Sequence, residues 1–170
     1  MHAKRSRLKR PLDANSAPQW PRDVVLFIDR CLGRFDVPDA LRQAGALVEV
    51  HHDHFSQDAK DQDWLPVVGA NGWLVLTNDK KFRHNYVELV AMFKGDVKAF
   101  VLGGKDASGQ KMGAIFVKAL KQIFSLASRL DAPFIANVTS AGNVSLAYHG
   151  SELFAALQAG PRNETRRGPA

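Results

Sequence analysis

Two short apolar runs in the chain each lead to an aspartate. The first covers residues 24–28 and is followed directly by Asp29, and the second covers residues 73–76 and is followed closely by Asp79. Unbroken apolar runs of this length, bounded by glycine or polar residues, predict buried strands of a parallel sheet. Ligands of such sheets bind outside the carboxyl ends of the strands, where the strand order reverses. We therefore expect Asp29 and Asp79 to meet there and to form a metal or phosphate site.

The remaining pattern alternates helices with strands. Apolar residues at three- and four-residue spacing predict helices, and short apolar runs predict strands. The predicted helices cover residues 36–45, residues 61 or 63 to 70, residues 85–95 and residues 112–130, with a short one from Ser151. The predicted strands cover residues 47–50, 97–102, 134–138 and 144–147. This alternation predicts right-handed crossovers and an α/β sandwich with a parallel core, in which the last strand lies antiparallel at the edge.

Length and charge divide the chain into a core and two tails. At 170 residues and 45% apolar content the chain is long enough for one domain with a full core. Of the net charge of +6, residues 1–22 carry +5 and residues 161–170 carry +2, which leaves −1 for the domain at residues 23–160. We expect both basic tails to be poorly ordered, and either to contact nucleic acid or to be simply solvated.

The single cysteine and the hydropathy indicate the compartment. One cysteine, Cys31, cannot form an internal bridge, which is typical of a reducing compartment. It is either a small buried hydrophobe or a thiol close to Asp29. The sequence shows neither an apolar segment as long as a membrane span nor a signal peptide. We therefore expect a cytoplasmic protein with no membrane partner.

Further acids could join Asp29 and Asp79 at the sheet edge. Asp61 and Asp63 begin a predicted helix, where either could instead be an N-cap, and Pro66 favours a start at Asp63 because proline is tolerated in the first turn. Crowded carboxylates repel one another unless a cation neutralises them. Mg²⁺ and Mn²⁺ prefer oxygen ligands and keep water molecules that can attack a phosphodiester.

Other candidate sites have simpler explanations. Glu88 follows Asn85 at the spacing of a capping box, and Asp106 fits a loop or cap position before the longest helix. Three histidines lie between His51 and His54, but neighbouring residues of a strand end point in opposite directions, and neither CxxC nor HExxH accompanies them. A zinc site is therefore not favoured. The phosphate-binding motifs GxxxxGK[ST] and GxGxxG are absent from the sequence.

Three motifs follow one another along the chain: Ile28-Asp29-Arg30, the helix start Asp61-Gln62-Asp63-Trp64, and the segment Val75-Leu76-Thr77-Asn78-Asp79-Lys80-Lys81. Together they resemble the PIN-like ribonucleases, in particular the bacterial branch that includes VapC-type toxins. The resemblance covers residues 24–102 by motif and the rest by topology. It implies a three-layer α/β/α sandwich with a mainly parallel central sheet, and RNA cleavage that depends on Mg²⁺ or Mn²⁺.

The same resemblance implies a role for each acid. By position, Asp29 is the first acid, Asp61 or Asp63 the second, and Asp79 the third. Many relatives have another acid just after the third, where this chain has Lys80, Lys81 and Arg83, so the number of metal ions stays open and Asp106 is a guess for the fourth acid. We expect Asp29 and Asp79 to bind the metal and the second acid to bind it or to orient the water.

Cations at the strand ends would then bind phosphates, and we expect this of Lys80, Lys81, Arg83 and Arg30. The expected partner is RNA, and a protein antitoxin and a homodimer are open. The main alternative is a degenerate PIN-like module that binds RNA or a protein without metal. Receiver domains, with an acid pair after the first strand, and Asp-x-Asp phosphatases fit less well, since Arg30 and Cys31 follow Asp29.

Overall fold

The computed structural model describes residues 19–161, so most of both predicted tails lies outside the described residues. The elements in chain order are β1 (Val25–Ile28), the 3₁₀ helix η1 (Arg30–Leu32), α1 (Asp36–Gln43), β2 (Leu47–Val50), α2 (His51–His54), α3 (Asp61–Ala70), β3 (Leu74–Thr77), the 3₁₀ helix η2 (Lys80–Arg83), α4 (Tyr86–Lys94), β4 (Lys98–Leu102), α5 (Gly109–Arg129), β5 (Phe134–Val138), β6 (Val144–His149) and α6 (Gly150–Gln158). The predicted alternation of strands and helices is confirmed.

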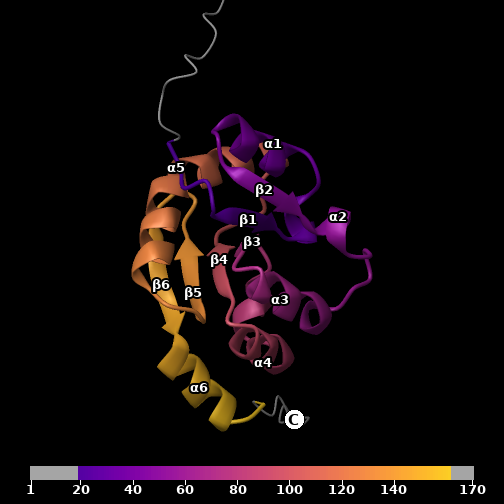
Figure 1. The fold of residues 1–170 in the computed structure, drawn as a ribbon, viewed down its shortest axis with the longest axis vertical. Helices are drawn as coiled ribbons and strands as arrows, with labels where there is room; N and C mark the ends of the chain where they lie inside the picture. The colour runs from indigo at the N-terminus through magenta and orange to yellow at the C-terminus, as the bar shows by residue number, and fades with distance from the viewer. Residues whose placement is uncertain (1–18, 162–170) are drawn as a thin grey trace, which may run out of the picture.

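The central sheet has six strands in the order β2-β1-β3-β4-β5-β6 (Figure 1). All neighbouring strands are parallel except β5 and β6, which are antiparallel as expected. The chain leaves β1 for β2 on one side and returns to β3 on the other, so the strand order reverses between β1 and β3. Ile28 pairs with Leu76, and the Asp29 amide donates a hydrogen bond to the Leu76 carbonyl at 3.0 Å. The residues that follow β1 and β3 therefore lie beside each other at the reversal point.

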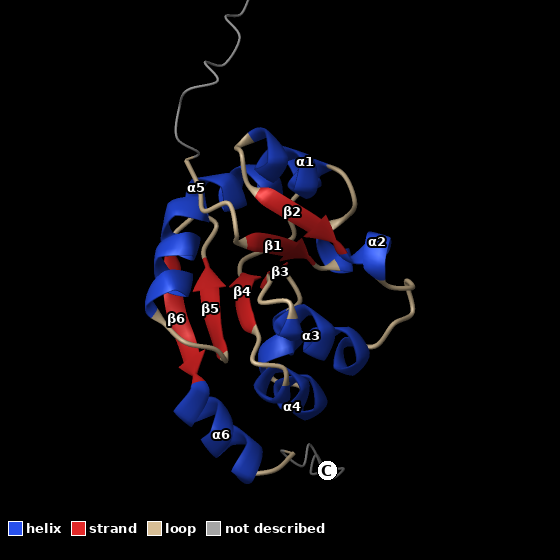
Figure 2. Ribbon diagram, viewed as in Figure 1, coloured by secondary structure: helices blue, strands red, loops and turns tan. Residues whose placement is uncertain are grey.

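Helices cover both faces of the sheet, as Figure 2 shows. Alternate strand residues point to opposite faces, so Leu26 and Ile28 join the core that contains α1 and α5, whereas Phe27 joins the core that contains α3, α4 and α6. Both cores consist of fully or almost fully buried side chains. The predicted three-layer α/β/α sandwich is therefore confirmed.

The start of α3 differs from the prediction. The helix begins at Asp61 rather than Asp63, its N-cap is Lys60, and no side chain caps it. Pro66 consequently lies inside the helix, where it removes one backbone hydrogen bond. Trp64 and Leu65 of this helix are completely buried, and their packing offsets that loss. Neither aspartate is thus an N-cap, contrary to the simpler explanation of these acids.

The longest helix, α5, begins at Gly109, three residues before the predicted start at Met112. Ser108 is its N-cap and accepts a hydrogen bond from the Lys111 amide at 3.2 Å. Its apolar side packs against the sheet. No helix within residues 19–161 is both long and apolar enough to cross a membrane.

The body of the domain reaches further toward the N-terminus than the predicted boundary at residue 23. The Trp20 indole donates a hydrogen bond to the Ala44 carbonyl at 2.7 Å. Its ring also lies 5.4 Å from that of Phe124 on α5. Trp20 therefore packs on the domain, although it falls within the stretch predicted as a tail.

Candidate active site

Asp29 follows β1 directly and is only 4% exposed. Its Oδ2 accepts hydrogen bonds from the Thr77 hydroxyl at 2.7 Å and from the Cys31 thiol at 3.1 Å. Its Oδ1 is buried and has no hydrogen-bond partner among the described residues. Burial raises the pKa of this carboxyl. One oxygen is thus held by donors from both strand ends, and the other is left free to bind a cation.

Thr77, the last residue of β3, connects the two strand ends. Its buried hydroxyl donates to Asp29 and accepts a hydrogen bond from the Asp79 amide at 3.0 Å. Cys31 is exposed as a residue, but its sulfur lies 3.1 Å from the Thr77 hydroxyl. Burial of the thiol and the neighbouring Asp29 charge raise the pKa of Cys31 to about 12. Cys31 therefore stays protonated at neutral pH and acts as a hydrogen-bond donor to Asp29.

Asp61 is held by two donors at the start of α3. Its Oδ1 accepts hydrogen bonds from the Trp64 indole at 2.9 Å and from Arg30 at 3.3 Å. Burial, and to a smaller extent the Asp79 charge, raise the pKa of Asp61, while the Trp64 and Arg30 contacts lower it. Asp63 is exposed, and within residues 19–161 its side chain makes no hydrogen bond or ion pair, although its amide donates to the Lys60 carbonyl at 2.9 Å. The structure thus brings Asp61, and not Asp63, to the other acids.

Arg30 contacts the protein with both terminal nitrogens of its guanidinium group. Besides Asp61, it donates to the carbonyl oxygens of Gln57, at 2.8 Å, and of Ala59. These bonds hold the segment that leads into α3. The structure therefore gives Arg30 a positioning contact with Asp61, whereas the sequence predicted a phosphate ligand.

Asp79 lies between β3 and η2 at the edge of the site. It is the N-cap of this 3₁₀ helix, and its Oδ1 accepts a hydrogen bond from the Lys81 amide at 2.9 Å. Asp79 therefore caps a helix in addition to lying at a strand end. Asp29 has the same position before η1 but makes no side-chain capping bond.

Glu88 is the acid that sequence reasoning missed. Its Oε1 accepts a hydrogen bond from the Asn85 side chain at 3.0 Å, and its Oε2 is buried without a partner among the described residues. Burial is the main cause that raises the pKa of Glu88 to about 7, and the charges of Asp61, Asp79 and Asp29 add to it. Glu88 therefore belongs to the same electrostatic cluster as the three aspartates.

The predicted capping box of Asn85 and Glu88 forms only in part. Asn85 does cap α4 and accepts a hydrogen bond from the Val87 amide at 3.0 Å. In a complete box the Glu88 carboxylate would return to the backbone of Asn85, but here it contacts the Asn85 side chain instead. The signal that could have identified it is its place in the first turn of a helix that begins at the edge bearing Asp79.

The donor set fits a small hard cation. Asp29 Oδ1 and Glu88 Oε2 are buried carboxylate oxygens without donors among the described residues, and a cation would offset the burial and the charge repulsion that raise the pKa values of these two groups. Across residues 19–161, no three acidic, histidine or cysteine side chains converge closely enough to enclose an ion. Mg²⁺ commonly takes one or two carboxylates and keeps several water molecules, so the arrangement fits such an ion better than a fully protein-enclosed one.

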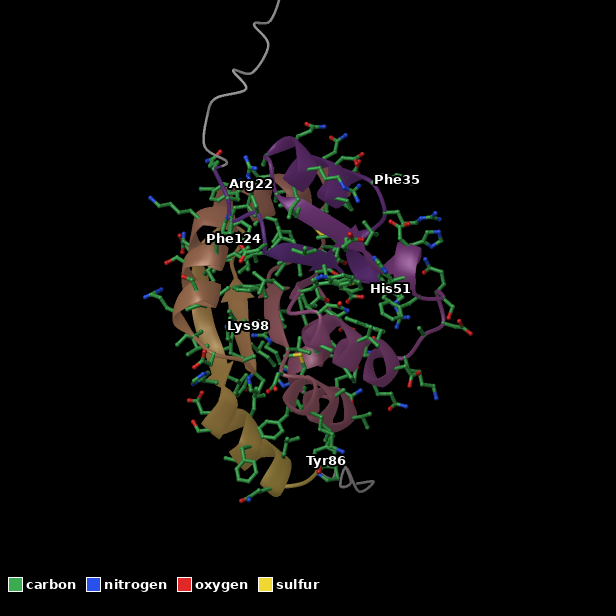
Figure 3. The ribbon with its side chains drawn as sticks, in the orientation of Figure 1. Arg22, Phe35, His51, Tyr86, Lys98 and Phe124 are labelled. Carbon is green, nitrogen blue, oxygen red and sulfur yellow. The ribbon has the colours of Figure 1, made fainter. Side chains whose placement is uncertain are left out.

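The other candidate ligands lie apart from this cluster. Asp106 is exposed in the loop after β4 and is not among the charges that act on Glu88. His51 is buried among aromatic rings (labelled in Figure 3), whereas His54 pairs with Glu49 at 2.6 Å and His52 with Gln57 at 3.1 Å. His51 and His54 share the neighbouring rings of Phe27 and Phe55, whereas His52 and His54 have different hydrogen-bond partners.

Three cations follow Asp79 along the same edge. Lys80 is exposed and its amine reaches the Gly104 carbonyl across the β4–α5 loop. Lys81 is exposed too. Arg83 donates to the side chain of Asn137 on β5, and its Nε is buried without a partner among the described residues. The acid cluster is thus bordered on the η2 side by positive charge.

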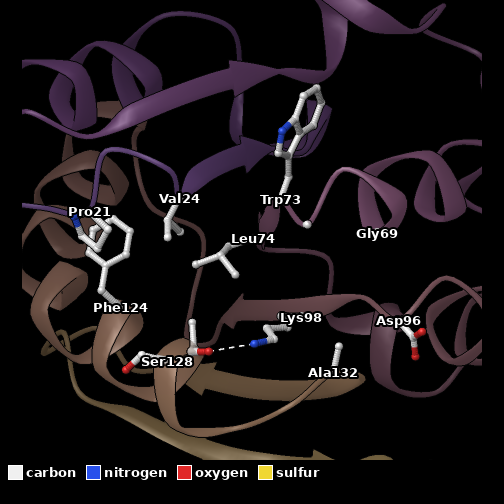
Figure 4. Close-up of a pocket in the computed structure, with 12 residues that line it drawn as sticks. Pro21, Val24, Gly69, Trp73, Leu74, Asp96, Lys98, Phe124, Ser128 and Ala132 are labelled. Atoms are coloured by element: carbon white, nitrogen blue, oxygen red, sulfur yellow. Dashed lines mark hydrogen bonds between the residues drawn. The ribbon is translucent and has the colours of Figure 1, made fainter.

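A separate cavity of about 360 Å³ lies at the amino ends of the parallel strands, away from the acids (Figure 4). Its lining includes Val24, Leu74 and Lys98, which precede or begin β1, β3 and β4. The Lys98 amine donates to the Ala127 carbonyl at 2.7 Å, marked by the dashed line in Figure 4. Since the acids follow the carboxyl ends of these strands, this mainly apolar cavity is not part of the acid site.

Comparison with known proteins agrees with this geometry. The family model described as "PIN like domain" matches residues 24–104, a stretch that contains Asp29, Asp61, Asp79 and Glu88. Over this stretch the chain is similar to the PIN-like domain family, as its motifs predicted. A relative in Mycobacterium tuberculosis (strain ATCC 25618 / H37Rv) bears the name "Putative ribonuclease VapC45" and is 28% identical over 117 residues, which are 66% of this chain and 84% of that protein. No solved structure matches the chain significantly.

Proposed function

We propose that the protein is a metal-dependent endoribonuclease. The observation that carries this proposal is the pair of buried carboxylate oxygens without donors, Asp29 Oδ1 and Glu88 Oε2, at the strand-order reversal of a PIN-like sheet. Buried acceptors are almost always hydrogen-bonded in native proteins, so these two indicate a missing cationic partner. The name of the mycobacterial relative supports ribonuclease chemistry.

Asp29 and Glu88 would hold Mg²⁺ or Mn²⁺, and Asp61 and Asp79 would contribute charge directly or through water. Such an ion lowers the pKa of a bound water and polarises the phosphodiester that the water attacks. Thr77 and Cys31 hold Asp29 in one orientation, so that its Oδ1 stays available. Arg30 and Trp64 fix Asp61 in the same way.

Lys80, Lys81 and Arg83 would neutralise the phosphates beside the scissile bond, since cations of this type position nucleic acid through its backbone. We further propose that the protein is the toxin of a toxin–antitoxin pair, which the VapC name of the relative supports. Its partners would then be RNA and a protein antitoxin. A homodimer and a cytoplasmic location stay predictions.

Calorimetric titration of Mn²⁺ separates this proposal from a degenerate module that binds RNA or protein without metal. Wild-type protein should bind Mn²⁺, Asp29→Asn should bind it much more weakly, and the exposed control Asp63→Asn should bind it like the wild type. Each Asn is isosteric with Asp, so the fold is preserved. Absence of Mn²⁺ binding to the wild type would favour the degenerate module.

A further inference from the structure

A large groove lies next to the acid cluster, between the start of α4 and the end of α6. Its volume is about 1020 Å³, at the upper end of the range of ligand clefts. Lys81 and Asn85 line it. The Lys81 amide donates to Asp79, and the Asn85 side chain donates to Glu88. The groove therefore begins where the candidate active site ends.

The groove is basic at this end. Lys81, Arg83 and His84 line it, and none of its lining residues within the described chain is acidic. One terminal guanidinium nitrogen of Arg83 donates a hydrogen bond to the Asn137 side chain, and the buried Nε of Arg83 has no acceptor among the described residues. A ligand in this groove would therefore meet positive charge and an unused donor, which favours an anion.

Aromatic, aliphatic and small side chains form most of the rest of the groove. Tyr86 from α4 and Tyr148 from β6 line it together with Ala156 and Ala159 of α6. The Tyr86 hydroxyl donates to the Leu157 carbonyl at 3.4 Å and so connects α4 to α6, at the place that Figure 3 labels. Basic grooves with aromatic side chains bind single-stranded nucleic acid by contacting the phosphates and stacking the bases.

We propose that this groove binds a single-stranded segment of RNA next to the scissile bond. The inference rests on the proposed nuclease function and adds the substrate class and its path. Phosphates would contact Lys81 and Arg83, and a base would stack on Tyr148. The α6 wall of the groove lies beyond residues 24–104, the part matched by the family model. The family model therefore does not include this part of the groove.

Fluorescence anisotropy with a labelled single-stranded RNA in EDTA measures binding while cleavage is blocked. Ala159 and Ala155 are both exposed residues at the end of α6, but only Ala159 lines the groove. Ala159→Glu should weaken binding roughly five-fold by like-charge repulsion, and Ala159→Lys should strengthen it. The matched controls Ala155→Glu and Ala155→Lys have the same net charges one helical turn away from Ala159 and outside the groove lining, so they should change the affinity less.

Stacking is tested at Tyr148. Tyr148→Ala should lose roughly ten-fold in affinity, whereas Tyr148→Phe keeps the ring and should bind like the wild type. RNA annealed to its complement should bind more weakly and should not respond to Tyr148→Ala. Since Tyr148 is partly buried and its Ala variant could lose stability, the exposed Ala159 pair gives an independent result.

Equal changes in RNA affinity at Ala159 and Ala155, or equal affinity of Tyr148→Ala and Tyr148→Phe, would refute the proposal that RNA binds in this groove. If the wild type still cuts RNA in that case, the nuclease proposal stands alone. If the wild type does not cut RNA but the predicted differences in binding appear, the groove stands and the nuclease fails. Unchanged RNA affinity in every variant would leave the groove to another ligand, such as a protein segment, and would refute this inference.

Discussion

Replacing Glu88 by glutamine should stabilise the metal-free protein, and the gain should depend on pH. Glutamine keeps the shape of the side chain and removes its charge from the cluster with Asp61, Asp79 and Asp29. The pKa of Glu88 rises from 4.5 to about 7 on folding, so the folded state binds this proton more tightly than the unfolded state. The stability that Glu88 contributes to the folded state by binding this proton is therefore fully present below pH 4.5 and is lost as the pH rises to about 7.

The size of the effect follows from that shift. At about 1.4 kcal/mol per pKa unit, the difference between 4.5 and about 7 gives an upper limit of about 3 kcal/mol above pH 7. Because the Glu88 carboxyl is partly exposed, solvent screening reduces this to ~1–2 kcal/mol. For a chain of this size the melting temperature of Glu88→Gln should then be roughly 2–8 °C above that of the wild type. At pH 5 the difference in the free energy of unfolding between Glu88→Gln and the wild type should be about a quarter of its value above pH 7.

Differential scanning calorimetry of both proteins in EDTA, at pH 5 and pH 8, measures this difference. The exposed control Asp63→Asn should melt like the wild type at both pH values. Adding Mn²⁺ should raise the melting temperature of the wild type more than that of Glu88→Gln, because ligand binding to the folded state stabilises it. A Glu88→Gln protein that melts no higher than the wild type at pH 8, or that differs equally at both pH values, would refute the reasoning.

Three further predictions follow from the site and the charge distribution. Asp61→Asn should lower the cleavage rate with little change in melting, and Asp63→Asn should change neither, as gel assays and thermal melts would show; equal losses would contradict the choice of Asp61. Cys31→Ser keeps a donor to Asp29 and should retain Mn²⁺ affinity, whereas Cys31→Val should weaken it in calorimetry; equal affinities would exclude a role for the thiol. Deleting residues 2–18 should flatten the dependence of RNA affinity on salt, by roughly 0.7 in log–log slope for each phosphate that these residues neutralise, and an unchanged slope would mean that they are simply solvated.

The fold was predictable because its four central strands, β1, β3, β4 and β5, are largely buried and therefore appear as mainly apolar runs. Asp29 and Asp79 could be placed at one edge for the same reason, since parallel strands bring their carboxyl ends together. The start of α3 was not predictable from local rules. The rule that restricts Pro66 to a first turn was overcome by the tertiary packing of Trp64 and Leu65.

The missed parts of the site depend on contacts between distant residues. A capping box accounted for Glu88 locally, and only the folded structure shows that its carboxylate lies near Asp61, whose charge raises its pKa. The guanidinium of Arg30 is occupied by a segment about thirty residues later in the chain, which no spacing indicated. The groove likewise depends on the contact of Tyr86 with the end of α6.

RNA cleavage by the wild type and Asp29→Asn is the most direct test of the central claim, that this carboxylate cluster is a metal-dependent nuclease site. Both proteins would be incubated with end-labelled single-stranded RNA in Mg²⁺, in Mn²⁺ and in EDTA, and the products separated on a denaturing gel. The wild type should cut the RNA internally with either metal and not in EDTA, and Asp29→Asn should cut under none of these conditions. Cleavage by the wild type in EDTA, or undiminished cleavage by Asp29→Asn, would contradict the account.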